Sequence, residues 1–248
     1  MKLVFTTLAI LLVFICNAQV MNIEQQRIVT DTTGWAGTSQ ISSSFTKNTA
    51  QLLTLGFKDH LQYKTDSSLY LMLIDYNLVK SPSSNFDNAG TLHFRYNYKL
   101  RNHITFEAFT QGQFNKQLNV SFRWLLGAGP RFKVLGGKNF RVYLASLYMY
   151  EYEELETPLL YHRNHRLSSY ISITWKHKSG TILTNTVYYQ PRLDRISDYR
   201  VYSQFDLNLK ISKKLSFSTS YKYFFDSNPA ENIIHATHNL SNGLTFRF

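Results

Sequence analysis

Cysteine is almost missing from this sequence, because its 248 residues contain a single one, Cys16. One cysteine cannot form an intramolecular disulfide or a cysteine-ligated metal site, so neither a disulfide scaffold nor a zinc-thiolate domain is expected. Long apolar runs are scarce too. The segment from Leu3 to Ile15 spans 13 residues, fewer than the roughly 20 that a membrane-spanning helix needs. No second long run follows it, so no helical membrane span is expected.

The N-terminal apolar run is typical of a secretory signal peptide. Lys2 precedes it and small residues follow it, so we expect cleavage after Ala18. Acylation of Cys16, as in a lipoprotein, is the alternative, but Phe14 and Ile15 are bulky where a lipobox carries small residues. The expected organisation is a signal peptide over 1–18, a short periplasmic N-terminal segment over 19–33 and one barrel domain over 34–248.

Acidic residues are few, whereas aromatic residues are abundant. The chain has 16 acidic against 27 basic residues, a formal net charge of +11, and an aromatic content of 15% with 17 Tyr and 18 Phe. A basic balance is common in proteins that bind nucleic acids or anionic surfaces. Tyr and Phe are the residues that a membrane β-barrel places in its lipid-facing girdles.

Apolar and polar residues alternate with period two in segment after segment from Gly34 onward. In the clearest segment Leu92, Phe94 and Tyr96 alternate with His93 and Arg95. Such segments are strands with one apolar and one polar face, and their length suits tilted strands that cross a membrane. We predict about twelve antiparallel transmembrane strands, near residues 34–46, 50–63, 68–79, 89–100, 103–114, 118–134, 139–152, 164–176, 181–190, 197–211, 214–226 and 235–248. Ten or fourteen strands are the alternatives.

The connections between these segments predict which way the chain runs. Every second connection is tight, as at Arg101-Asn102, and periplasmic turns of outer-membrane barrels are short. The intervening connections are longer on average, including Ser81 to Asn88 and Glu153 to Arg163. Because strands in hydrocarbon cannot leave an open edge, these strands are expected to close into an outer-membrane β-barrel. Pro130 interrupts one segment, and we expect a bulge, a bend or a strand end there.

The last strand carries a candidate assembly signal. Leu244, Phe246 and Phe248 alternate with polar residues and the chain ends on the aromatic. This pattern resembles the terminal strand of bacterial outer-membrane proteins, where it is the signal read by the barrel-assembly machinery. Asn242 departs from the pattern.

The polar faces of the strands are expected to line the lumen. Basic residues outnumber acidic ones there, so we expect the excess positive charge to be internal, which argues against nucleic-acid binding. Two interpretations remain open: a narrow anion-favouring pore, or a plugged interior in which Glu107 pairs with the arginines of both neighbouring strands, Arg95 and Arg123. The lumen-lining candidates are Arg95, Lys99, Glu107, Arg123, Arg141, Arg200, Asp206, Lys210 and Lys222.

No constellation predicts an enzyme, a metal site or a cofactor. His238 and Ser241 are similar to the His-x-Ser-Asn signature of outer-membrane phospholipases, but three positions apart on a strand they face opposite sides. His162 and His165 diverge for the same reason. The outward glutamates from Glu151 to Glu156 are expected to form a solvated loop rather than a Ca²⁺ site, because no glycine turn or Asp-x-Asp spacing organises them.

Two segments in the middle of the chain are distinctive: Glu107-Ala108-Phe109-Thr110-Gln111-Gly112-Gln113-Phe114 and Arg123-Trp124-Leu125-Leu126-Gly127-Ala128-Gly129-Pro130-Arg131. They resemble the family of salt-induced outer-membrane proteins, a domain of unknown function found in Gram-negative bacteria. The resemblance covers most of residues 34–248. It implies an outer-membrane barrel and no established substrate, catalytic residue or cofactor.

Three function hypotheses from different classes follow. The first is a structural or passively permeable barrel, the second a barrel hydrolase acting on lipid, and the third a surface receptor or adhesion barrel. The expected location is the outer membrane of a Gram-negative bacterium. Expected partners are outer-membrane lipid, lipopolysaccharide and the barrel-assembly machinery, with no nucleic acid. The solute and the oligomeric state are left open.

Overall fold

The computed structural model describes residues 33–47, 51–81, 84–212, 215–231 and 233–246. They form twelve strands and one 3₁₀ turn, η1 (Lys116–Leu118). The strands are β1 (Gly34–Lys47), β2 (Gln51–Lys64), β3 (Ser68–Ser81), β4 (Ser84–Arg101), β5 (Ile104–Asn115), β6 (Val120–Gly136), β7 (Phe140–Leu155), β8 (Leu160–Lys176), β9 (Ile182–Pro191), β10 (Tyr199–Lys210), β11 (Leu215–Asp226) and β12 (Ala236–Phe246). No helix in these ranges is long and apolar enough to cross a membrane.

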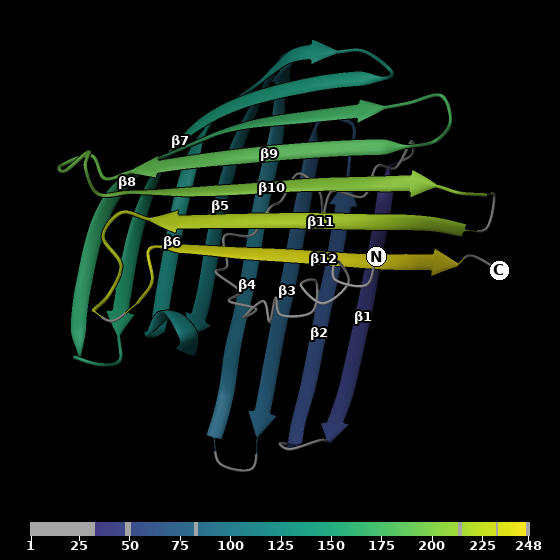
Figure 1. Cartoon of the computed structure of the whole chain (residues 1–248). Coiled ribbons are helices and arrows are strands. Elements are labelled where there is room, and N and C mark those ends of the chain that lie inside the picture. The colour runs from purple at the N-terminus through teal and green to yellow at the C-terminus, as the bar shows by residue number, and fades with distance from the viewer. Residues whose placement is uncertain (1–32, 48–50, 82–83, 213–214, 232, 247–248) are drawn as a thin grey trace, which may run out of the picture.

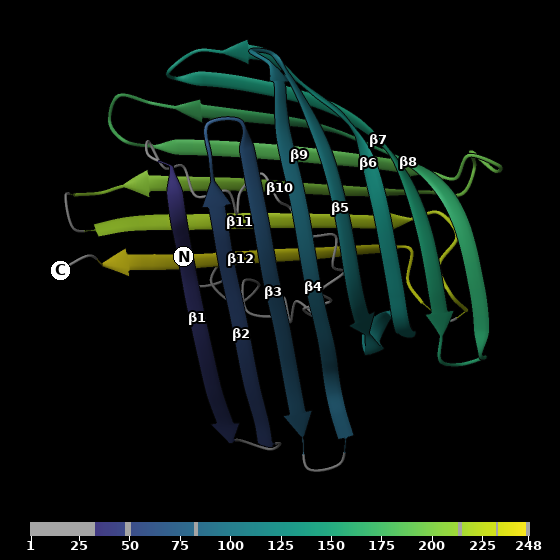
Figure 2. The ribbon, with the colours of Figure 1, turned by 180° about the vertical axis from the view of Figure 1, so that it is seen from behind.

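All twelve strands belong to one antiparallel sheet in which each strand pairs with its neighbours in the sequence. The sheet is strongly curved, so that β9 to β12 pass across the concave side of β1 to β4 (Figure 1, Figure 2). Within the described ranges no ladder joins β12 to β1. The prediction of an all-β antiparallel barrel fold with twelve strands is confirmed.

Strand positions follow the sequence prediction closely, and the main differences are at two connections. The segments 81–88 and 153–163 are not long loops, because β4 already begins at Ser84, β7 continues to Leu155 and β8 begins at Leu160. Polar residues such as Asn85, Asp87 and Glu153 have low strand propensity, but they pair with residues of a neighbouring strand, and pairing outweighs propensity. The longest connections in the described ranges are 192–198 and 227–235.

The prediction for Pro130 is wrong in part, since β6 neither ends nor shifts register there. Pro130 lies opposite Phe106 of β5 in a ladder that continues on both sides, and the register shifts of β6 are at its two ends. The ladder with β7 is interrupted, because Gly129 and Pro130 have no partners in it. Gly129, which precedes Pro130, explains how closely β6 approaches β7. A Cβ atom on Gly129 would lie 2.4 Å from the carbonyl oxygen of Ser146 and 2.7 Å from Cα of Leu147 on β7. Only glycine allows the two backbones to approach so closely.

The exposure of the two faces of the sheet is the reverse of that in a water-soluble protein, because the polar side chains are buried and the apolar ones are exposed. On β4, Thr91, His93, Arg95 and Asn97 on the concave side are buried, whereas the alternating apolar side chains are exposed, with Phe94 at 42%. The same alternation runs along β5 and β7 to β10. Exposed apolar side chains in such numbers require a nonaqueous surround, and the buried polar side chains require partners.

Candidate functional site

The buried polar residues form a network in the interior of the barrel, and Glu107 on β5 is one of its centres. Glu107 is 0% exposed. Arg95 Nη1 lies 2.9 Å from Glu107 Oε2, and the Tyr170 hydroxyl donates to the same oxygen at 3.0 Å. Arg131 Nε lies 3.7 Å from the other carboxylate oxygen, and its guanidinium stacks at 3.6 Å on the Tyr143 ring. One carboxylate is thus shared by two arginines from the two neighbouring strands.

The sequence prediction named Arg95 correctly and the second arginine wrongly. Arg123 pairs in register with Gln113, whereas Glu107 lies opposite Gly129. Because Gly129 has no side chain, Arg131 at the next concave position reaches the carboxylate. Arg131 shares its face with Arg123, so the strand alternation could have identified it.

Glu151 on β7 is the second centre, and it is also 0% exposed. It accepts hydrogen bonds from Asn164 at 3.0 Å, from Arg166 Nε at 3.1 Å and from Arg200 Nη1, and Arg123 Nε lies 3.9 Å away. Glu151 lies within the strand predicted over 139–152, on its polar face, and the alternative that it belongs to a solvated outward loop is wrong. β7 extends to Leu155, so the alternation carries Glu151 into the interior.

Further carboxylates complete the pairing of these arginines. Arg200 also binds Asp226 at 2.7 Å and Glu153 at 3.3 Å, and Arg123 binds Glu153. Glu153 was expected in the outward loop, and Asp226 closes the strand before a predicted connection, so their pairing was missed. Glu153 lies on the concave face of β7, which runs beyond the predicted end at residue 152, and Asp226 is the last residue of β11, where the predicted strand also ended.

Side chains of the β9–β10 connection, residues 192–198, contact the same network. Arg166 Nη2 lies 3.0 Å from Asp198 Oδ1, and Arg192 binds Asp198 at 3.1 Å and Asp194 at 2.6 Å. The hydrogen bond from Arg192 lowers the pKa of Asp194 below its ordinary value. Asp194 and Asp198 raise the pKa of Arg192 in turn.

The network closes the end of the barrel where the odd-numbered strands finish. Ala230 and Ile233 of the β11–β12 connection pack against Leu118, Val120 and Leu155 from the far wall. Beneath them the arginines and carboxylates cross the interior. A cluster of large side chains follows, in which Phe109, Leu147, Met149, Tyr170, Tyr188, Tyr202 and Phe224 are buried. This half of the interior is filled.

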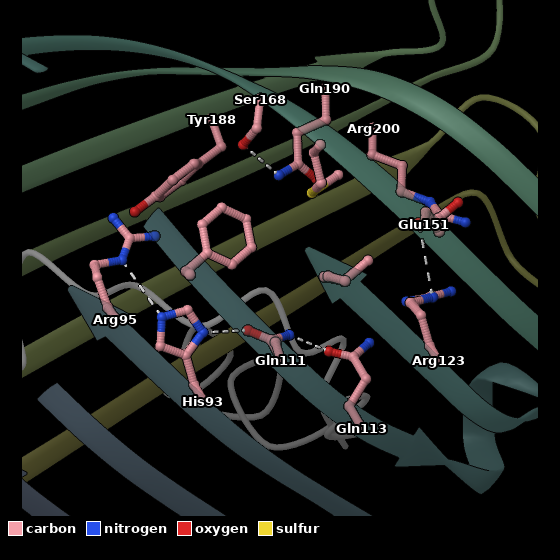
Figure 3. Close-up of a pocket in the computed structure, with 13 residues that line it drawn as sticks. His93, Arg95, Gln111, Gln113, Arg123, Glu151, Ser168, Tyr188, Gln190 and Arg200 are labelled. Atoms are coloured by element: carbon pink, nitrogen blue, oxygen red, sulfur yellow. Dashed lines mark hydrogen bonds and ion pairs between the residues drawn. The ribbon is translucent and has the colours of Figure 1, made fainter. Parts of the chain in front are cut away.

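A small cavity remains within the filled half (Figure 3). Its volume is about 40 Å³, enough for a few water molecules and no more. His93 crosses one wall, where Arg95 Nε lies 3.4 Å from His93 Nε2 and His93 Nδ1 lies 2.8 Å from Gln111 Oε1. Gln111 in turn donates to Gln113. This pattern fits a neutral imidazole with its proton on Nδ1.

The buried charges balance, so the positive excess expected on the inward face is absent from the filled half of the interior. Among the described residues five arginines and five carboxylates are buried: Arg95, Arg123, Arg131, Arg166 and Arg200 against Glu107, Glu151, Glu153, Asp198 and Asp226. Two half-exposed pairs lie nearer the other end, Lys58 with Asp75 at 3.5 Å and Asp206 near Lys222. Burial penalises any charge without a partner, so a filled interior must be nearly neutral.

The lumen-lining candidates therefore divide by depth. Arg95, Glu107, Arg123 and Arg200 are buried in the network, and Arg141, Asp206 and Lys222 are half-buried on the concave side. Lys99 and Lys210 are exposed at the end of the barrel where the even-numbered strands finish. Their role in a lumen stays a prediction.

The remaining predictions concern the assembly signal, His238 and a possible metal site. Leu244 and Phe246 pair with Phe217 and Leu215 across β11, whereas Phe248, the signal peptide and segment 19–32 lie outside the described residues. His238 Nδ1 and the Tyr221 hydroxyl form a hydrogen bond of 2.7 Å on the outer face. In the part of the chain that the structure describes, no three His, Cys, Asp or Glu residues cluster as a metal site would require.

Aromatic side chains gather at two levels of the outer face. Near the end with the tight turns, Trp35 stacks on Tyr63 with ring centroids 4.9 Å apart, and Tyr70 on Tyr96 at 5.0 Å. Near the filled end, similar contacts join Tyr150 to His165, Tyr189 to Tyr199 and Tyr199 to Phe225. An apolar outer face between two aromatic girdles, around a polar interior, defines a porin-like β-barrel of the outer-membrane type.

Sequence comparison then identifies the family. The model of the family described as "Protein of unknown function, DUF481" matches residues 41–248, and the chain belongs to that family. The description does not mention salt induction, so that part of the resemblance stays a prediction. No curated protein matches the chain in sequence.

Several solved outer-membrane structures are similar to this chain at low sequence identity. The NanC porin aligns over 86% of this chain and 99% of its own, with a TM-score of 0.50 and 12% identity. The KdgM porin in complex with disordered oligogalacturonate covers 85% and 99%, with a TM-score of 0.41 and 13% identity. The β domain of the Bordetella autotransporter BrkA covers 87% and 99%, at 0.37 and 12%. The NanC alignment shows the fold alone, and we draw nothing further from the two lower scores.

Proposed function

We propose that this protein is an integral outer-membrane barrel of a Gram-negative bacterium whose interior is closed by its ion-pair network, a structural barrel rather than an open pore. The observation that carries this proposal is the balance of five buried arginines and five buried carboxylates around a cavity of about 40 Å³. A hydrated ion needs a continuous water-filled path, and the buried side chains of the filled half leave little room for one. The neutral interior also weighs against an anion-favouring pore.

The spacing of the two girdles supports the membrane location. On β8, His165 lies at one girdle and the exposed Trp175 at the other. Ten residues at about 3.3 Å each span about 33 Å along the strand, which a tilt of about 40° reduces to about 25 Å. That is the height of the apolar band of an outer-membrane barrel. The proposed surroundings are therefore outer-membrane lipid and lipopolysaccharide, reached through the barrel-assembly machinery.

Recording in planar lipid bilayers tests the closed interior. Purified wild-type protein should give no conductance steps in any salt. The double variant Arg200→Ala with Glu151→Ala removes one opposite pair from the middle of the network, keeps the charge balance and should give steps. Steps from the wild-type protein would refute the proposal. Silence from a variant that is inserted, as measured by protease protection, would show that other side chains close the path.

The orientation can be tested separately, since the only cysteine precedes the strands. The proposed topology puts both ends of the barrel and the tight turns in the periplasm. Lys178→Cys is in such a turn and Lys116→Cys is at the opposite end. A membrane-impermeant maleimide added to intact cells should label the cysteine at 116 and not the one at 178. The reverse pattern would overturn the orientation.

A further inference from the structure

The positive charge of this chain is concentrated at the end of the barrel with the tight turns. In the turns and the last four strand positions at that end, the described residues that are at least partly exposed include one acid, Asp66. The basic ones, named here the basic rim, are Lys64, Lys99, Arg101, Lys133, Lys138, Arg141, Lys176, Lys178 and Lys210. The rim belongs to six strands, between β2 and β10, and to two turns, so its cations lie around much of the mouth instead of forming a patch on one side.

The strand alternation directs most of the rim inward. Lys210 shares its face with the buried Gln204, Lys176 with the buried Ser172, and Arg141 with the buried Ala145. The opposite, lipid-facing positions at this level carry aromatic rings such as Trp175. A membrane lipid would meet those rings first. The cations therefore face whatever enters the mouth of the barrel.

Burial along the concave face shows that water reaches this end. On β10, Arg200, Tyr202 and Gln204 are buried, Asp206 is half-buried and Lys210 is exposed. β7, β8 and β9 show the same trend. The interior is therefore filled at the end where the odd-numbered strands finish, and it becomes accessible to water towards the basic rim.

Small hydroxyl side chains line the accessible part of the concave face. Ser216, Ser218 and Ser220 on β11 are half-buried, as are Thr174 on β8 and Thr184 on β9. None of them is large enough to fill the space that tyrosines and arginines fill at the other end. Their hydroxyl groups can both donate and accept hydrogen bonds, so this surface suits a polar ligand.

We propose that the basic rim and the hydroxyl-lined face beyond it form a binding site for a flexible polyanion, a chain that carries repeated carboxylate, sulfate or phosphate groups. Cations on different strands are separated by multiples of about 4.8 Å, which a single small anion cannot bridge. A chain with repeated charges binds several of them at once, and each further contact forms at high effective concentration. The periplasmic location of this site rests on the proposed function, whereas the binding itself does not.

A binding experiment with the full chain in detergent micelles tests the proposal. The probes are fluorescently labelled dextran sulfate, polyglutamate and polyphosphate, with neutral dextran of the same length as the reference, and the readout is fluorescence anisotropy. We expect the polyanions to bind and the neutral dextran not to bind. The affinity should fall steeply between low and high salt, because exposed charges are screened beyond about 8 Å at physiological ionic strength. Differences among the three polyanions would identify which anionic group the site prefers.

Charge-neutralising variants locate the site. Lys99→Gln, Arg101→Gln and Lys178→Gln together remove three exposed cations of the rim, and the affinity for dextran sulfate should fall about tenfold, since each exposed pair contributes about 0.2–1 kcal/mol. An unchanged affinity would overturn the proposal, as would equal binding of neutral dextran.

The matched control changes the same charge at the other end of the barrel. Lys80→Gln, Lys116→Gln and Arg195→Gln remove three exposed cations there, and the affinity should stay within about twofold of the wild-type value if binding is local. An equal loss in both triple variants would mean that net charge and not the rim attracts the polyanion, which would refute the site. Conductance and membrane location are measured independently, so a failure here leaves the proposed function intact, and the reverse also holds.

Discussion

Glu151 offers the sharpest test of the buried network. Glu151→Gln keeps the shape of the side chain and removes its charge, so four carboxylates remain against five buried arginines. Arg166 keeps Asp198 at 3.0 Å, and Arg200 keeps Asp226 at 2.7 Å and Glu153 at 3.3 Å. Removing one partner of a buried ion pair costs about 3–5 kcal/mol. Because the arginines keep those contacts, we expect the lower end, about 3 kcal/mol, or about a 100-fold smaller folding constant.

The control is in the same strand, three residues away. Glu154 is half-exposed on the outer side and accepts a hydrogen bond from the Tyr152 hydroxyl at 2.5 Å. Glu154→Gln should change the free energy of unfolding by about 0.5 kcal/mol or less, as surface substitutions do. Guanidinium unfolding in lipid vesicles measures both variants, and the exposed outer-face Trp124 and Trp175 report the loss of lipid contact.

A double variant separates charge imbalance from simple loss of a contact. Adding Arg166→Gln to Glu151→Gln restores equal numbers of buried charges, so the two changes together should cost less than their sum by about 1–3 kcal/mol. Two results would refute the reasoning: a Glu151→Gln variant as stable as Glu154→Gln, or a double variant whose cost equals the sum of the single costs.

Two further predictions concern the backbone and the β9–β10 connection. Gly129→Ala should destabilise the barrel by about 1–3 kcal/mol, because the added Cβ atom would contact the β7 backbone. Gly112→Ala should be tolerated, because the nearest atom to its Cβ would be a Phe122 carbon at 3.9 Å. Equal unfolding midpoints for the two variants would contradict this prediction. Arg192→Gln should raise the pKa of Asp194, which the hydrogen bond from Arg192 lowers, and carboxyl ¹³C NMR would show it. Since that pKa is lowered on folding, the pair stabilises the connection at neutral pH and is lost as the pH falls through the folded-state value; an unchanged pKa in the variant would contradict the assignment.

Much of the fold is predictable from the sequence because alternation is a local property. Each strand of this barrel has polar partners on its concave face and apolar surroundings on its outer face. Ten consecutive residues of β4 are therefore enough to show both faces. Connections are harder. Glu153 and Asn85 look like loop residues, and only pairing with a neighbouring strand makes them part of β7 and β4. That pairing depends on another segment, which local composition does not contain.

The pairing within the interior is predictable only in part, for a related reason. Alternation says which side of the sheet a residue faces, and this placed Arg95, Glu107, Arg123 and Arg200 on the concave side. It does not give the register between strands. The register decides whether Glu107 meets Arg123 or Arg131, which are eight residues apart on β6, and the register of β5 and β6 places Gly129 opposite Glu107.

Strand alternation predicts which face a charge lies on, but it does not give the depth of that charge along the strand. Arg95 and Lys99 lie on the same face of β4, four residues or about 13 Å apart, yet Arg95 is buried against Glu107 and Lys99 is exposed. Where side chains exclude water, an unpaired charge costs several kcal/mol, so every buried arginine has a carboxylate. Where water enters, no such constraint applies and cations can accumulate. The nine cations of the basic rim, with Asp66 as the one exposed acid beside them, therefore account for much of the formal charge of +11, whereas the buried charges of the filled end balance.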